Sequence, residues 1–179
     1  MSEYTGPIAG QIAGLCVPAD PSHPIRPVSV DPRDVYAVPG VVGGHIVPIH
    51  QDAPPVTFWL RQDAAGLGLP VNSRATVLVQ LTKRWAHSPY LRGTVALTGH
   101  PDARGAPTSV PQQVLTLLLH ARLFKIEVEL GGNGWATNAM LFTDWLSAAI
   151  FVIDLGRRWP EVTATRIAPA DPPPAGPRT

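Results

Sequence analysis

The clearest pattern in the chain is the alternation of apolar and charged residues from Phe124 to Leu130. Phe, Ile, Val and Leu lie at the even-numbered positions and Lys and Glu at the odd ones, which predicts a strand with one buried face. Residues 131–134 tolerate positive φ and predict a hairpin turn. Residues 135–142 are therefore expected to return as the partner strand.

A helix is expected to follow this hairpin. Thr143 is the predicted cap, Asp144 lies near the positive end of the helix dipole, and Pro160 ends the helix. The predicted buried stripe consists of apolar residues at helical spacing, namely Trp145, Leu146, Ala149, Ile150 and Ile153. A strand over residues 162–167 closes this C-terminal ββαβ unit, which spans residues 122–168.

The N-terminal folded unit is expected over residues 25–100. Its predicted elements are a strand at 26–30, a short helix at 32–42, strands at 45–49 and 56–61, a helix at 73–85 and a strand at 91–98. Pro27 confines the first strand to a sheet edge or to a strand start. Gly43 and Gly44 stop the short helix, and Asn72 caps the longer one.

The remaining segments have compositions that disfavour a packed core. Residues 1–24 are rich in Gly, Pro and Ala without a sustained period, and we expect a disordered arm. Residues 101–121 are expected to form a linker and a helix, and residues 169–179 a Pro-rich tail. The predicted fold class is α+β, mainly antiparallel sheet with helices packed on one face, in two small sub-units.

The overall composition is that of a globular protein of balanced charge. The formal net charge is +1 and hydrophobic residues make up 45% of the chain, so nothing global indicates a polyanionic partner or a membrane. The single cysteine, Cys16, excludes an intrachain disulfide and fits a reducing cytoplasm. Glu3 and the lack of Lys or Arg before Arg26 argue against a signal peptide, so we expect a cytoplasmic protein.

Two stretches resemble known sequence patterns. Val42-Gly43-Gly44-His45-Ile46, an aromatic strand around Phe58-Trp59, and Gly68-Leu69-Pro70-Val71-Asn72 with Ala75-Thr76 resemble a family of small proteins of unknown function. That family is encoded by bacteriophages, plasmids and Gram-positive bacteria, especially actinobacteria, and the resemblance covers residues 25–99. Trp135-x-x-Asn138-x-x-Leu141-Phe142-Thr143, with Asp154-Leu155 and Arg158-Trp159, is similar to a short module of actinobacterial phage and mobile-element proteins. The resemblance implies no catalytic residues.

The residue types used in catalysis and metal binding occur here without a recognisable motif. The glycine runs fit a helix stop and a hairpin turn better than a phosphate loop. His45 and His50 flank one strand on opposite faces, and the sequence leaves open whether His87 or His100 approaches them. Cys16 lies in the expected arm, where no base would be held beside it. We therefore predict no catalytic residue, no metal and no cofactor.

Two candidate binding features remain. Asn72 is expected to be a helix cap, with a buried amide that contacts a ligand as the alternative. Arg157, Arg158, Trp159 and Arg166, with Arg122 and Lys125, are candidates for a surface that contacts phosphates and stacks a base. Interleaved acids, namely Glu127, Glu129, Asp154 and Glu161, dilute that charge, so charge complementation at the helix end is favoured.

Three functions are compatible with these observations. The preferred one is a small accessory protein that binds an unknown protein partner without catalysis. A nucleic-acid-binding module that uses the Arg/Trp surface is the alternative, and a hydrolase with an unrecognised His/Asp site is the third. An open sheet edge or an exposed apolar patch would favour the first.

Overall fold

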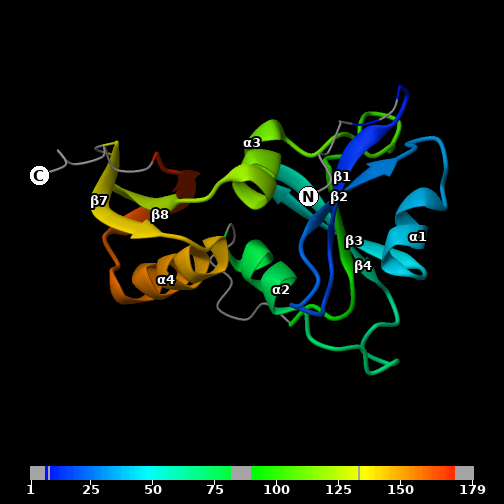
Figure 1. Ribbon diagram of the computed structural model, residues 1–179, viewed down its shortest axis with the longest axis horizontal. Coiled ribbons are helices and arrows are strands. Elements are labelled where there is room, and N and C mark those ends of the chain that lie inside the picture. Colours follow the sequence, from blue (N-terminus) through cyan, green and yellow to red (C-terminus); the bar gives the residue numbers. More distant parts are fainter. Residues whose placement is uncertain (1–6, 8, 82–89, 133, 172–179) are drawn as a thin grey trace, which may run out of the picture. The chain divides into compact units, whose positions relative to one another are not determined.

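The computed structural model describes residues 7, 9–81, 90–132 and 134–171. It divides into two compact units, residues 1–115 and 116–179 (Figure 1), and the division falls within the segment expected as linker and helix. The expected ends of the helix after Asn72 and of the Pro-rich tail, together with His87, lie outside the described residues.

The first unit contains a five-stranded antiparallel sheet in the order β2-β1-β5-β4-β3. The strands are β1 (Ile12–Val17), β2 (Arg26–Val30), β3 (Ile46–Asp52), β4 (Pro55–Arg61) and β5 (Val95–Gly99). Its helices are α1 (Ala37–Val42), α2 (Ser73–Gln80) and α3 (Gln112–Leu115). Pro27 lies in the edge strand β2, as expected, and the hairpin β3–β4 pairs Ile46 with Arg61.

The expected disordered arm is wrong where it covers β1. This strand lies between β2 and β5, and five of its six residues are buried. A strand that is buried on both faces has no polar alternation, so its short apolar run gives no period to recognise. Gly14 allows close packing there, because a Cβ would lie 3.1 Å from the Leu97 carbonyl oxygen and 3.1 Å from a Val28 methyl, tighter than ordinary contacts.

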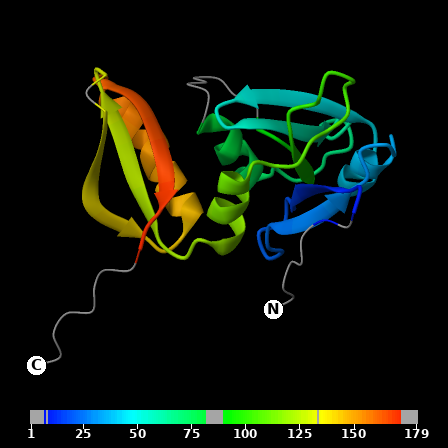
Figure 2. The same cartoon turned by 90° about the horizontal axis from the view of Figure 1, so that it is seen from above.

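Helices cover both sides of the five-stranded sheet, as Figures 1 and 2 show for α1 and α2. The face under α1 has a core of Val30, Val38, Val42 and Ala96. Helix α1 begins later than Asp31 and Pro32 predict, and Gly43 ends it with a φ of 79° that L-residues rarely adopt. The sequence predicted that helices pack on one face of the sheet, and this holds in the second unit. The predicted α+β class holds for both units.

The second unit is the expected ββαβ arrangement. Its sheet has the order β7-β6-β8, with β6 (Phe124–Leu130), β7 (Trp135–Phe142) and β8 (Val162–Pro169) all antiparallel. Helix α4 (Trp145–Arg158) lies along one face of this sheet (Figure 1), and a π-helical turn, η1 (Thr116–His120), precedes it in the chain.

Two details of α4 differ from the prediction. Asp144, and not Thr143, is the N-cap, because its carboxylate accepts the Ser147 N–H at 2.8 Å. Ile150 is 54% exposed, whereas Ala149 is buried. The helix is apolar around most of its circumference, so spacing alone does not determine which apolar residues face the sheet.

Candidate functional site

The face of the second sheet that points away from α4 carries the most developed polar cluster of this unit. Phe142 is opposite Phe124 and its ring contacts Phe151 of α4, with ring centroids 5.5 Å apart. The even-numbered residues of β6 therefore face α4, and the odd-numbered ones face the opposite side. Glu127 lies at the centre of that opposite face, since Arg166 and Thr137 are its register partners on the two neighbouring strands.

Glu127 is held between two cations. Lys125 Nζ lies 2.9 Å from its Oε1, and Arg166 Nε donates to its Oε2. The hydrogen bond from Lys125, followed by that from Arg166, lowers the pKa of the Glu127 carboxyl. These contacts explain how a glutamate on the polar face is only 9% exposed, because its charge is paired on both oxygens.

Trp135 completes the cluster. The Arg166 guanidinium carbon lies 4.2 Å from the centroid of the Trp135 ring, a cation–π geometry. The planar face of the Arg166 guanidinium therefore stacks on the Trp135 indole, while its Nε donates a hydrogen bond to Glu127. A phosphate that bound Arg166 would have to compete with the Glu127 carboxylate. The contacts of Arg166 therefore hold Trp135 against the sheet, and they leave Arg166 poorly available to a phosphate.

Of the four residues predicted as one surface, three lie together at the end of α4, whereas Arg166 lies apart from them on β8. Arg158 pairs with Asp154 at 3.0 Å, one turn earlier on α4, and Trp159 is the C-cap of that helix. Arg157 lies in the same last turn, where a cation complements the helix dipole. Arg166 lies on the sheet face opposite α4. Sequence reasoning missed Trp135 as the partner of Arg166, because only the pairing of β7 and β8 with β6 brings the two together.

The side chain of Asn72 is hydrogen-bonded to backbone groups of the protein. Its side chain is fully buried, and its Oδ1 accepts the Ala75 N–H at 3.0 Å, which confirms the helix cap. Its Nδ2 donates to Val17 O and to Gly93 O, both at 2.9 Å. With each amide group paired inside the protein, the structural role accounts for this residue without a ligand.

Two histidines approach each other on the first sheet. The rings of His50 and His100 are 5.8 Å apart and almost perpendicular. His50 Nδ1 lies 3.0 Å from Thr57 Oγ1, and His100 Nε2 lies 2.8 Å from Gln51 O. Across residues 7, 9–81, 90–132 and 134–171, no three His, Cys, Asp or Glu side chains form a group suited to a metal ion.

Cys16 lies in the inner strand β1 and is 2% exposed, so its expected place in a disordered arm is wrong. Burial raises the pKa of its thiol, although Arg26 and Arg74 oppose this effect. A buried thiol with a raised pKa is a poor nucleophile.

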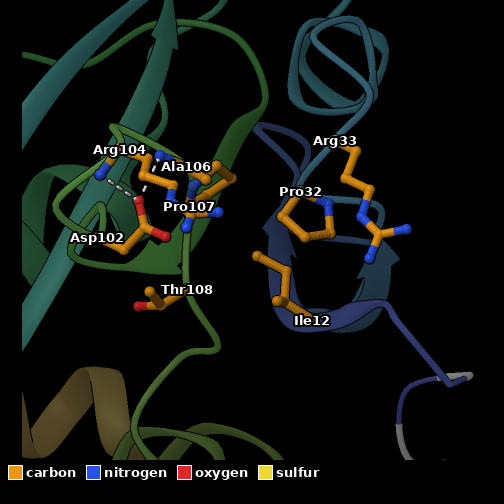
Figure 3. Close-up of a pocket in the computed structure, with 8 residues that line it drawn as sticks. All are labelled: Ile12, Pro32, Arg33, Asp102, Arg104, Ala106, Pro107 and Thr108. Carbon is orange, nitrogen blue, oxygen red and sulfur yellow. Dashed lines mark hydrogen bonds between the residues drawn. The ribbon is translucent and has the colours of Figure 1, made fainter.

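An open pocket of about 440 Å³ lies between the start of β1 and the loop after β5 (Figure 3). Arg104 reaches from this loop toward Pro32, and Arg33 lies on the far side of Pro32. One oxygen of the Asp102 carboxylate is engaged within the loop, because Oδ1 accepts the N–H groups of Arg104 at 2.8 Å and Ala106 at 2.9 Å. The carboxylate holds the loop, and the other lining groups are mostly apolar.

Strand β7 is the most exposed strand of the described chain. Its first seven residues are all exposed, and its sequence contains neither a charge nor a proline. The large side chains among them are Trp135, Met140 and Leu141, with exposed fractions of 43%, 45% and 41%. An uncharged edge strand with exposed apolar side chains is the feature that the sequence analysis associated with protein binding.

A comparison with protein families gives one match. The family described as Domain of unknown function (DUF3846) matches residues 15–123, more than half of the chain. The chain belongs to this family. The expectation of an uncharacterised family is thereby confirmed. Comparisons with curated proteins and with solved structures gave no match.

The DUF3846 match covers the first unit from Leu15 onward and ends at Leu123, one residue before β6. The cluster of Glu127, Arg166 and Trp135 therefore lies outside the matched region, as does the exposed strand β7. Among the helices that the structure describes, none combines the length and the apolar character needed to cross a bilayer.

Proposed function

We propose that this DUF3846 protein is a small accessory protein of phage or mobile-element type that acts by binding another protein, without catalysis. The single observation that carries the proposal is strand β7, an uncharged sheet edge with exposed Trp135, Met140 and Leu141. Exposed apolar groups gathered on one edge lower the free energy of the protein when a partner covers them. The phage, plasmid and actinobacterial setting is supported by the motifs in residues 25–99 and at the C-terminal end.

The charges of the second unit favour a protein partner over a nucleic acid. Arg166 and Lys125 share the Glu127 carboxylate, which offsets one of their two positive charges, and Arg158 is paired with Asp154. A surface that binds phosphates through counterion release needs cations that are free to replace the counterions. Trp135 is 43% exposed beside its contact with Arg166, and an exposed indole suits an apolar or aromatic side chain of a partner.

The test is affinity capture of the tagged full chain from its native host, with and without nuclease. We expect a partner protein that survives nuclease treatment and is lost when Met140→Lys places a charge on β7. Val35→Lys is the matched control, because Val35 is 76% exposed and lies in the other unit, so this variant should capture as the wild type does.

The same experiment can contradict the proposal. Capture that nuclease abolishes, and that depends on Arg157, Arg158, Trp159 or Arg166, would favour the nucleic-acid alternative. Equal loss of capture in Met140→Lys and Val35→Lys would show that β7 is not the contact surface.

A further inference from the structure

We draw no further inference here: the strongest candidate, the face of the β7-β6-β8 sheet that points away from α4 and exposes Trp135 and Leu141, carries no proposal because nothing in the structure shows what covers it.

Discussion

Replacing Asn72 by alanine removes three side-chain hydrogen bonds from the interior of the first unit. The cap that Oδ1 provides to the Ala75 N–H is worth about 1 kcal/mol. Each bond from Nδ2, to Val17 O and to Gly93 O, is worth about 1 kcal/mol more. We therefore expect Asn72→Ala to lower the free energy of unfolding by about 3 kcal/mol, a large share of the roughly 5–15 kcal/mol typical of a domain.

A serine at the same position separates the two contributions. Asn72→Ser keeps a capping oxygen but is too short to reach either carbonyl, so it should cost about 2 kcal/mol and leave the cap intact. Ser73→Ala is the control, because Ser73 is the exposed neighbour and its change should stay within about 0.5 kcal/mol.

The assay must report on the first unit alone. Native-state hydrogen exchange of the amides in β1 and β5 gives the free energy of opening for the sheet that Asn72 joins to α2. If Asn72→Ser is as stable as the wild type, the bonds to Val17 O and Gly93 O contribute nothing. If Asn72→Ala is as stable as Asn72→Ser, the cap contributes nothing either.

The second unit supports two further predictions. Ile126→Ala should lower the free energy of unfolding by denaturant by about 2–5 kcal/mol, because Ile126 is 3% exposed. Ile150→Ala should lower it by less than about 1 kcal/mol, because Ile150 is largely exposed. Equal losses would contradict the orientation of α4 on the sheet. The lowered pKa of Glu127 means that its contribution is complete above the ordinary glutamate pKa and is lost as the pH falls through the folded-state pKa. The unfolding midpoint of the wild type should therefore exceed that of Glu127→Gln at neutral pH and converge with it in acid, and a gap that persists at low pH would refute the ion-pair assignment.

Local patterns predicted the elements whose chemistry is local. The alternation in β6 gave its buried face correctly, and the cap at Asn72 followed from a polar residue before a helical stretch. Strand β1 was not predicted, because an inner strand that is buried on both faces has no alternation of apolar and polar residues to detect. The predicted orientation of α4 was wrong at Ile150. Because this helix is apolar around most of its circumference, its tertiary contacts decide which side faces the sheet.

The candidate site depends on register, which sequence patterns determine poorly. Arg166 was identified as a surface cation, but its place among Glu127 and Trp135 requires the pairing of β6 with both of its neighbours. A shift of one residue in either strand would move Arg166 or Trp135 to the face under α4. The grouping of Arg166 with Arg157 and Arg158 failed for the same reason, since closeness in sequence does not place residues on one face of a sheet and its helix.

The family match does not extend to strand β7. DUF3846 membership rests on residues 15–123, so it accounts for the first sheet and its protected edges, and it leaves the ββαβ unit to be explained from its own contacts. Within that unit β8 ends in a proline and β6 is paired on both sides, so β7 is the edge strand that contains no proline. Proline and charge at the other three edges disfavour pairing, and β7 has a bulge in place of them. Their absence from β7 is therefore the sequence feature that most directly connects this fold to a binding role.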